Sequence, residues 1–561
     1  MTISASPRQR DYATHTVENV ASPLEDYNLY SQDQVLMAAV HREGAAHAAA
    51  ELDAFGQHIG RAEYLALGDV ANHIRPELAT HDRYGRRQDL VSFHPAYHQL
   101  MQSAITHGLH SLPWEAARVA GHVHRAAMCY MHAQVEAGHG CPITMTFAGV
   151  AALRATPELS RSWLPKISSR VYDARNISHE SKAGLTLGMA MTEKQGGSDV
   201  RSNSTRAYPL GHPGSGMPYE LVGHKFFVSA PMSDAFLMLA QAPGGLTCFL
   251  VPRWRGCNDK NAVELVRLKD KMGNASNASS EVELRGALGW MVGEEGRGVS
   301  TIIEMVAMTR FDCMVGSAAG MRMAVSQALH HCQQRSAFGA LLSEQPLMQN
   351  VLADLALENE AALHLSMRMA RALDHSEQES ERLLARLGVA VGKYWICKRT
   401  PQHAYEAMEC IGGSGVMENC MMPRLYREAP INAIWEGSGN VQCLDVLRAL
   451  RKTPAVLEAF WQETALAQGQ HALFDSFISQ LQRGFKSADA GDLEFDARRW
   501  VDQMALALQA SLMVRYSPAE VADAFCVSRL QQGPQHHYGT LPRGAAARTL
   551  LLRASVEAHS L

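Results

Sequence analysis

The sequence contains no apolar run long enough to cross a membrane and no early apolar stretch that could act as a signal peptide. A spanning helix needs at least about 18 largely apolar residues, and every apolar stretch here is interrupted sooner. The first 20 residues, MTISASPRQRDYATHTVENV, are mostly polar. We therefore expect a cytoplasmic protein that does not associate with a membrane.

The usual sequence signals for metal sites and disulfides are also absent. The chain has 11 cysteines and 26 histidines, but it contains neither a Cys-x-x-Cys pair nor the His-Glu-x-x-His spacing that places two ligands on one helical face. Cys248 lies in the mainly apolar stretch Thr247–Leu250, as expected for a reduced thiol in a core. We predict no disulfide and no bound metal.

The charges nearly cancel, with Lys+Arg 52, Asp+Glu 56 and a formal net charge of -4. Such a chain exerts no overall attraction on nucleic acid or acidic membranes, so any binding of this kind must come from a local patch. The length of 561 residues exceeds what one core supports, roughly 250 to 300 residues. We expect three or four packed units.

The residue pattern changes three times along the chain. Alanine-rich helical stretches come first, interrupted by the polar run His81–Asp89, and short β-branched and aromatic runs separated by glycine and proline follow. Long helical patterns then return, and the last segment has its own apolar stripe at Phe474, Phe477, Ile478 and Leu481. The sequence predicts an α+β protein, mainly α, with four parts: 1–188 helical, 189–292 β, 293–453 a helical bundle, and 454–561 an additional helical domain.

The segment Met191–Val200, MTEKQGGSDV, gathers chemically useful groups on one short loop. Thr192 and Ser198 can donate hydrogen bonds to ring heteroatoms or phosphate, and Gly197 lacks the Cβ that would keep a flat or anionic ligand away. Taken alone, the segment is equally compatible with a polar turn that binds nothing. Other segments are needed to decide between the two.

Three further segments follow in order: Arg335–Gly339 (RSAFG), Glu409–Gly415 (ECIGGSG) and Ile434–Asn440 (IWEGSGN). Together with MTEKQGGSDV, they resemble the acyl-CoA dehydrogenase flavoprotein superfamily over about residues 110–455. The phrases LVGHKFF, RLKDKMGNASNAS and PRLYREAPINAIWEGSGNVQCLDVLR are similar to its AidB-like subgroup, flavoproteins of the bacterial adaptive response to DNA alkylation, over nearly the whole chain.

The resemblance implies an FAD-containing homotetramer of acyl-CoA dehydrogenase-like fold. It implies that Thr192 and Ser198 contact the flavin ring and pyrophosphate, and that Arg335 and Phe338 reach the cofactor of a neighbouring subunit. The full set of cofactor-binding residues it implies is Met191, Thr192, Gly197, Ser198, Phe227, Val228, Ser229, Arg335, Phe338, Gly412, Gly413, Trp435, Gly437, Ser438 and Asn440. Without the resemblance, Arg335 could simply pair with an acid on a solvated helix, and Gly412–Gly415 could be only a helix stop.

Glu436 is the predicted catalytic base. It lies between Trp435 and Gly437, where a carboxylate would be partly desolvated and its proton affinity raised. In the family this position removes the α proton of an acyl thioester while flavin N5 takes a hydride from the β carbon. One branch of the family carries its base at the position of Thr309, which cannot do that work. The alternative is that Glu436 only caps a helix. The bulk of Trp435 predicts weak turnover of acyl-CoA.

The AidB-like resemblance also implies binding of double-stranded DNA through the last helical domain. Residues 451–561 contain equal numbers of basic and acidic side chains, so a basic face requires uneven placement. The candidates are Arg448, Arg451, Lys452, Arg529, Arg543, Arg548 and Arg553. Binding should be non-specific and salt-sensitive because no groove-reading motif is present. Two alternatives stay open: solvated helix faces, and an ordinary acyl-CoA dehydrogenase acting on a short or branched acyl-CoA without a DNA role.

Overall fold

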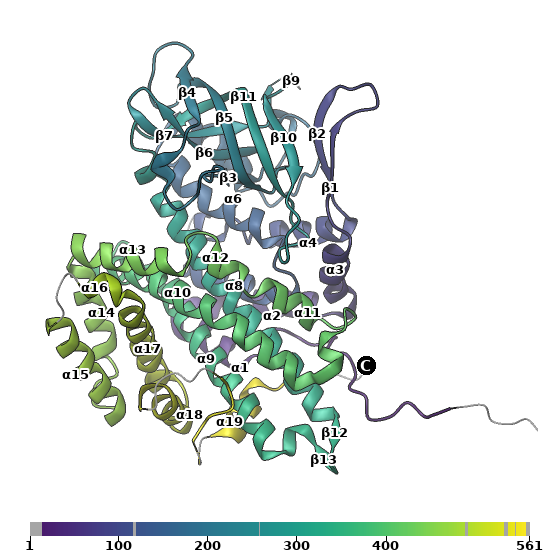
Figure 1. Cartoon of the computed structure of the whole chain (residues 1–561), viewed down its shortest axis with the longest axis vertical. Coiled ribbons are helices and arrows are strands. Elements are labelled where there is room, and N and C mark those ends of the chain that lie inside the picture. Colours follow the sequence, from purple (N-terminus) through teal and green to yellow (C-terminus); the bar gives the residue numbers. More distant parts are fainter. Residues whose placement is uncertain are drawn as a thin grey trace, which may run out of the picture.

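The structure is a computed structural model of the chain and describes residues 14–115, 119–256, 259–487, 492–531, 537–542, 544 and 546–556. A β domain stands at one end of a larger helical body (Figure 1). The fold is α+β and mainly helical, as the sequence predicts. Among the described residues, no helix combines the length and the apolar content needed to span a membrane.

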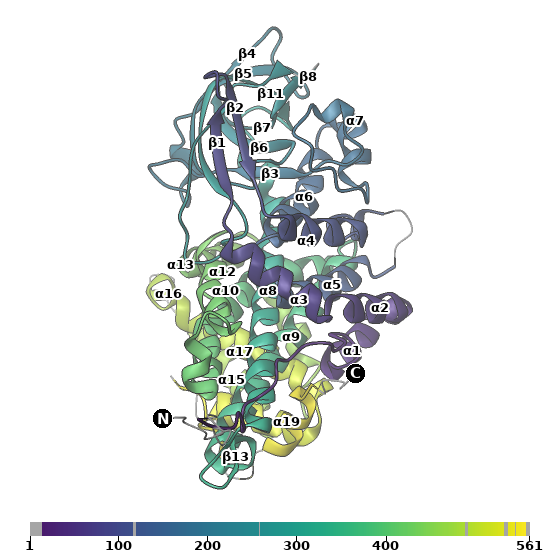
Figure 2. The ribbon, with the colours of Figure 1, turned by 90° about the vertical axis from the view of Figure 1, so that its right-hand side faces the viewer.

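The N-terminal part is helical but also contains a β-hairpin that the sequence analysis missed. The polar run His81–Asp89, expected to be a break between helices, forms the turn between β1 (Glu77–His81) and β2 (Arg87–Ser92). Asp82 accepts hydrogen bonds from the amides of Tyr84 and Arg86, which fixes this turn. The hairpin lies alongside the β domain (Figure 2). The helices of this part are α1 (Gln34–Val40), α2 (Ala49–Ile59), α3 (Ala62–His73), α4 (Pro95–Thr106), α5 (Gly121–Val135), α6 (Gly140–Leu153) and α7 (Pro157–Ile167).

The β domain is a seven-stranded sheet in the order β10-β11-β5-β4-β6-β3, with β7 paired to both β11 and β6. Its pairs are antiparallel except for β3 with β6 and β4 with β6. Apolar side chains such as Phe236 and Phe249 fill its core. The strands are β3 (Leu187–Ala190), β4 (Arg206–Pro209), β5 (Pro218–Ser229), β6 (Ala235–Ala242), β7 (Gly245–Pro252), β10 (Val263–Leu268) and β11 (Ser279–Val292), with the small pair β8 (Trp254–Gly256) and β9 (Asp259–Lys260) beside them.

Three long helices form the centre of the bundle: α8 (Gly298–Gln334), α9 (Pro346–Asp374) and α10 (Glu379–Ile411). A short hairpin, β12 (Ser336–Ala337) and β13 (Ala340–Leu341), separates α8 from α9. The bundle is completed by α11 (Met422–Glu428), α12 (Ile431–Ile434) and α13 (Gly439–Lys452).

The last helices share one continuous apolar core with the bundle and the N-terminal helices. Phe474 and Leu481 are buried, and Phe477 and Ile478 pack against the same core, in line with the predicted stripe. These helices are α14 (Ala455–Ala465), α15 (Ala472–Ser487), α16 (Asp492–Phe495), α17 (Ala497–Tyr516), α18 (Ala519–Phe525) and α19 (Ala547–Ala554).

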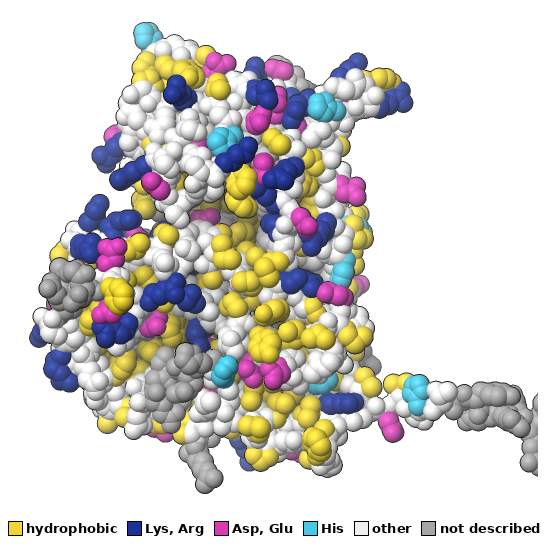
Figure 3. Space-filling view, in the orientation of Figure 1, with side chains coloured by type: hydrophobic (Ala, Val, Ile, Leu, Met, Phe, Trp, Pro, Cys, Tyr) yellow, Lys and Arg dark blue, Asp and Glu magenta, His cyan; other side chains and the backbone are white. Residues whose placement is uncertain are grey.

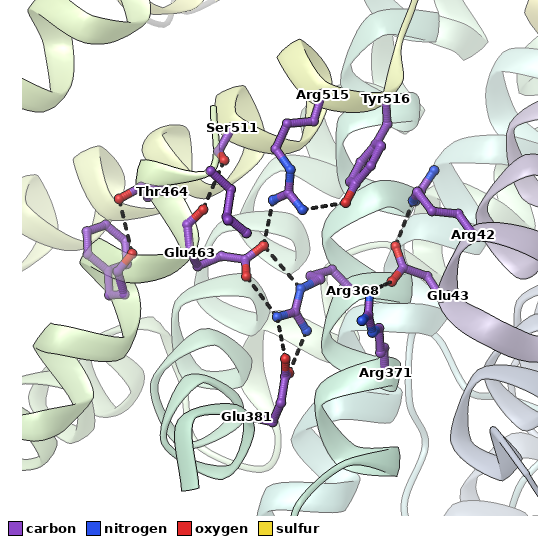
Figure 4. Close-up of polar contacts among 12 residues, drawn as sticks. Arg42, Glu43, Arg368, Arg371, Glu381, Glu463, Thr464, Ser511, Arg515 and Tyr516 are labelled. Atoms are coloured by element: carbon purple, nitrogen blue, oxygen red, sulfur yellow. Dashed lines mark hydrogen bonds and ion pairs between the residues drawn. The ribbon is translucent and has the colours of Figure 1, made fainter. Parts of the chain in front are cut away.

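Buried ion pairs reinforce the contact between the last helices and the bundle (Figure 4). Glu463 on α14 binds Arg368 on α9 at 2.7 Å and Arg515 on α17 at 2.8 Å. Arg368 also binds Glu381 on α10 at 2.7 Å. Because a buried charge is costly once its partner is removed, this network requires the last helices to stay docked on α9 and α10.

Candidate functional site

Glu436 lies in the loop between α12 and α13 and has an unusual backbone conformation. Its φ is +57° and that of Gly437 is +96°, so two successive residues adopt left-handed conformations. A Cβ on residue 437 would come within 2.7 Å of Nε2 of Gln442. The loop therefore requires glycine at 437, and it holds Glu436 in a conformation that non-glycine residues rarely adopt.

The carboxylate of Glu436 is half-buried against α8, the helix that follows the β domain. Its Oε2 accepts a hydrogen bond of 2.8 Å from Oγ1 of Thr309. Burial raises the pKa of Glu436 above its ordinary value, and this effect is opposed by the hydrogen bond from Thr309 and by the charges of Lys393 and Arg310. The environment is the desolvated one expected from the sequence. Thr309, which the sequence analysis considered only as an unsuitable base, is the partner of Glu436.

The peptide groups around Glu436 are held by three side chains. Nζ of Lys393, on α10, donates to the carbonyl oxygens of Trp435 at 2.7 Å and Gly437 at 2.6 Å. Nε of Arg310 donates to the carbonyl oxygen of Glu436 at 3.0 Å, and Gln442 donates to the same oxygen at 3.1 Å. Lys393 could not be identified from its neighbours in the sequence, because a lysine in the middle of a helical pattern is normally exposed to solvent.

The second wall of the site consists of the loop after β3 and the end of β5. The amide of Phe226 donates to the carbonyl of Thr192 at 2.9 Å, which ties the two segments together. Phe227 is 48% exposed and Ser229 is half-buried on the same strand face. The strand alternation points Val228 the other way, and its side chain is fully buried in the β core. The expectation that Val228 binds the cofactor stays a prediction, and any such contact would involve its backbone.

Within MTEKQGGSDV, the carboxylate is structural. Glu193 is fully buried and binds Nζ of Lys225 at 2.8 Å. It also accepts hydrogen bonds from the amides of Ser204 and Thr205. A Cβ on Gly197 would come within 2.4 Å of Oγ1 of Thr192, so any other residue at this position would force the Thr192 side chain to move.

Cys141, on α6, lies where the two walls approach each other. Its thiol contacts the side chain of Ser229, and it is close enough to Glu436 and Lys271 for their charges to change its pKa. Burial raises the pKa of the Cys141 thiol to about 11, Lys271 lowers it and Glu436 raises it. Cys141 therefore lies near both Ser229, a predicted flavin-side residue, and Glu436, the predicted base, although these two are more than two hundred residues apart in the sequence.

Arg335 and Phe338 do not approach Glu436 within one chain. They belong to the β12–β13 hairpin, at the end of the helical body opposite the β domain (Figure 1). Arg335 donates to the carbonyl oxygen of Asn19. Phe338 is completely exposed and has a φ of +53°. These positions fit a contact outside the chain better than a contact with its own site.

Several other predicted cofactor residues already have partners inside the protein. The indole N–H of Trp435 donates to Oδ1 of Asn432 at 2.8 Å, and Oδ1 of Asn440 accepts from Arg498 at 2.9 Å. Met191 packs against the core beneath the sheet. Ser438 precedes α13 as its N-cap, without a side-chain hydrogen bond to the helix. The cofactor contacts of Trp435 and Asn440 stay predictions, and they would have to use atoms other than this N–H and this Oδ1.

The remaining features fit a flavin dinucleotide. Gly412 and Gly413 are exposed at the end of α10, and a Cβ at either would meet nothing within 4 Å, so the backbone is open to a ligand. Ser198 is exposed, and the ring of Phe227 offers an aromatic surface near Ser229. Hydroxyl donors, an aromatic wall and bare backbone are what a flavin and its phosphates need.

The candidate DNA-binding residues divide into two groups. Arg529 is only 3% exposed and binds Asp354 and Glu358 in the interior, and Arg553 forms a bidentate pair with Glu360. Their expected contact with phosphates is corrected, because both guanidinium groups serve internal acids. Arg448, Arg451, Lys452 and Arg548 are exposed, and Arg543 lies outside the described residues.

The helical body also exposes apolar side chains on one face. Figure 3 shows an apolar area over its middle, with basic side chains to one side. The exposed apolar residues contributed by α10, α11, α12 and the segments that join them include Tyr405, Val416, Met417, Tyr426 and Ile434. Contiguous exposed apolar surface of this kind is typical of an interface.

Comparisons with known proteins agree with this geometry. Three family models match in order: the adaptive response protein AidB N-terminal domain over residues 19–174, the acyl-CoA dehydrogenase middle domain over 188–287, and the acyl-CoA dehydrogenase C-terminal domain over 296–451. The chain is 47% identical over 517 residues to the putative acyl-CoA dehydrogenase AidB of Escherichia coli K12, covering 92% of this chain and 94% of that protein.

A solved structure is similar over almost the same extent. The crystal structure of Caenorhabditis elegans ACDH-11 in complex with C11-CoA superposes with a TM-score of 0.85 at 28% sequence identity, covering 94% of this chain and 95% of that one. An acyl-CoA dehydrogenase complexed with FAD from Bacillus anthracis has the same fold, with a TM-score of 0.59 and 18% identity, covering 77% of this chain and 80% of that one. The chain therefore belongs to the acyl-CoA dehydrogenase family of FAD-dependent oxidoreductases, which act on CH–CH groups.

Proposed function

We propose that this chain is an AidB-like flavoprotein that oxidises acyl-CoA thioesters weakly and binds double-stranded DNA non-specifically in the response to DNA alkylation. The observation that carries the catalytic part is the half-buried carboxylate of Glu436, which is held by Thr309 on a braced loop and lies near Cys141, the neighbour of Ser229. The C11-CoA in the similar C. elegans structure supports a thioester as the substrate.

In this mechanism Glu436 takes the α proton of the thioester. The β hydrogen leaves with its two electrons, so the product is an α,β-unsaturated thioester and Glu436 becomes neutral. FAD, when bound, supplies the two-electron acceptor. Thr309 fixes one carboxylate oxygen of Glu436 through its hydrogen bond, and the raised pKa of Glu436 strengthens it as a base. Trp435, whose indole N–H donates to Asn432, precedes the base in the chain, and its bulk is the reason that we expect weak turnover.

The test is the substitution Glu436→Gln in the FAD-loaded protein. We expect anaerobic flavin bleaching by a panel of acyl-CoA thioesters to slow by at least about 100-fold, since general base catalysis contributes 10² to 10⁴. The FAD content should not change. Thr309→Val is the matched control, because it removes the hydrogen bond but keeps the carboxylate, and it should change the rate much less. Bleaching at the wild-type rate by Glu436→Gln would remove this residue from the mechanism.

The DNA part of the proposal is carried by exposed basic side chains at the end of α13. Arg448, Arg451 and Lys452 are exposed, whereas Arg529 and Arg553 are neutralised inside the protein. We expect wild-type protein to retard duplex DNA at low salt and to release it at high salt. Arg451→Ala with Lys452→Ala should weaken retardation several-fold. Arg83→Ala with Arg86→Ala, equally exposed on the β1–β2 hairpin, is the control and should leave it unchanged.

An ordinary acyl-CoA dehydrogenase without a DNA role is the alternative outcome of the same experiments. Rapid bleaching by a short or branched thioester, together with no retardation of DNA at any salt concentration, would favour it. Both partners in the proposal, acyl-CoA and DNA, would be met in the cytoplasm.

The proposal includes assembly as a homotetramer. It is supported by the exposed apolar area on the helical body and by the complete exposure of Phe338 next to Arg335. In such an assembly, Arg335 and Phe338 would complete the cofactor site of a neighbouring subunit, and FAD retention would depend on oligomerisation.

A further inference from the structure

Lys393 is a buried cation whose charge has no counterion beside it. Its side chain is 1% exposed, and its ammonium group donates to the carbonyl oxygens of Trp435 and Gly437. In the part of the chain that the structure describes, no carboxylate lies within ion-pair distance of this nitrogen. Burying an uncompensated charge is expensive. A lysine at this place therefore needs a role that a neutral side chain would not fulfil.

Arg310, the other cation near Glu436, shares its counterion with further arginines. Arg310 binds Asp445 at 2.9 Å, and Asp445 also binds Arg386 at 2.9 Å. Because one carboxylate serves these arginines, the cluster keeps a net positive charge. Both Arg310 and Lys393 act to lower the pKa of Glu436, and Lys393 has the larger effect of the two.

The remaining titratable groups around Glu436 are thiols. Cys141 faces it from α6, and Cys313 from α8. Burial raises the pKa of Cys141 to about 11 and that of Cys313 well above its ordinary value, so both stay neutral near pH 7. Thr309 contributes a hydrogen bond but no charge. The charged groups facing Glu436 are therefore Arg310 and Lys393.

We propose that Lys393 is a positioning residue for the reaction: its ammonium group joins the two peptide groups on either side of Glu436 and supplies the positive charge that keeps this base ionised. The inference rests on the proposed role of Glu436 as the base. By binding the carbonyls of residues 435 and 437, Lys393 maintains the left-handed conformation of Glu436, whose φ is +57°. By its charge it opposes the burial that favours the neutral carboxylic acid.

The test separates charge from geometry with two substitutions. Lys393→Met removes the charge and all donors, whereas Lys393→Gln removes the charge but keeps an N–H donor. Lys398→Met is the matched control, since it makes the same change five residues further along α10 at an exposed position. The measurement is the rate of anaerobic flavin reduction per bound FAD as a function of pH, with a saturating thioester that bleaches the wild-type flavin.

We expect both substitutions at Lys393 to move the midpoint of the rising limb to higher pH by about one unit or more, because an opposite charge nearby shifts a carboxyl pKa by 1 to 3 units. The rate at the high-pH plateau should fall about 100-fold in Lys393→Met, as for a misplaced catalytic group. Lys393→Gln should recover part of that plateau. Lys398→Met should leave both the midpoint and the plateau unchanged.

A second measurement needs neither substrate nor flavin turnover. The pH dependence of the unfolding free energy, compared between wild type and Glu436→Gln, reports the folded-state pKa of Glu436. The same comparison between Lys393→Gln and the double variant Lys393→Gln/Glu436→Gln reports it without the lysine. We expect the folded-state pKa of Glu436 to be higher without the lysine than with it, by about one unit or more.

The outcomes distinguish the inferred role of Lys393 from the proposed role of Glu436 as the base. If Glu436→Gln bleaches normally, the proposed role of Glu436 fails. If Glu436→Gln is inactive but the Lys393 variants keep the wild-type midpoint and plateau, the base is retained and the inference about Lys393 is overturned. If Lys393→Met does not fold, Lys393→Gln and the unfolding comparison still decide the question. A change in stability alone, with an unshifted pKa of Glu436, also overturns it.

Discussion

The loops that carry Glu193 and Glu436 are built on the same plan, yet they treat their carboxylates in opposite ways. Each loop follows a short element, contains a closely packed glycine and is held by a buried lysine from a neighbouring element. In the β domain, Lys225 binds the carboxylate of Glu193 directly. In the bundle, Lys393 binds the backbone and leaves the carboxylate of Glu436 to Thr309.

The pKa values of the two acids reflect this difference. Burial acts to raise the pKa of Glu193, but the hydrogen bonds and charge of Lys225 and the hydrogen bonds of Thr205 and Ser204 hold it well below its ordinary value. Burial raises the pKa of Glu436, and its partners only reduce the effect. A carboxylate that serves the fold is thus saturated with donors, whereas one available for chemistry keeps unsatisfied acceptor capacity.

The largest expected effect comes from breaking the ion pair in the β domain. Lys225→Met leaves Glu193 buried without a cation, and we expect the free energy of unfolding to fall by about 3 to 5 kcal/mol. Urea denaturation measures this. Lys225→Met combined with Glu193→Met should recover much of the loss, because both charges are then removed together. If the double variant is as unstable as the single one, the pair is not what holds this loop.

Replacing the glycine of either loop, Gly437 or Gly197, should have an effect of intermediate size. Gly437→Ala places a Cβ at a φ of +96° and within 2.7 Å of Gln442, so we expect a loss of about 1 to 3 kcal/mol and a slower flavin reduction. Gly197→Ala meets only the side chain of Thr192, at 2.4 Å, and its loss should be smaller because that side chain can rotate. Thermal unfolding compares them. Equal losses would mean that backbone conformation is not the main constraint at 437.

The smallest effect is a difference in pH dependence. Since the folded-state pKa of Glu436 is raised, its ionisation destabilises the fold as pH rises from the ordinary value of about 4.3 through the raised value. Glu436→Gln should therefore gain on the order of 1 kcal/mol over wild type towards neutral pH. Glu193 behaves in the opposite way: its contribution is complete above about pH 5 and is lost as pH falls. Glu193→Gln should thus be destabilised at neutral pH and approach wild type in acid. If the unfolding free energy changed with pH in the same way in Glu436→Gln and Glu193→Gln, the proposed difference between the two carboxylates would be contradicted.

The order of the domains and the desolvated setting of Glu436 could be predicted because both are encoded locally. The change from helical to strand periodicity near residue 189 and the motif around Glu436 can be read within short windows. The β1–β2 hairpin was missed because its strands are short and its turn is polar, so its only signal resembles that of a loop.

The supports of the site could not be predicted for a different reason. Lys393 and Thr309 reach Glu436 from helices that are 43 and 127 residues away in the chain. Nothing in the residues adjacent to either position indicates this partner. Arg529 was misread in the same way, since its acids Asp354 and Glu358 belong to α9. A charge in a helical pattern can be assigned to solvent or to the interior only once the packing of the helices is known.

The ion pairs around Glu463 also limit how the protein can be divided. A shortened gene ending after α13 would supply neither Glu463 nor Arg515, and Arg368 would keep Glu381 as its only counterion from this network. Such a fragment would bare the apolar surface of α9 and α10 to water. The helical bundle and the C-terminal helices are therefore expected to fold only together, so that neither part is stable when expressed without the other.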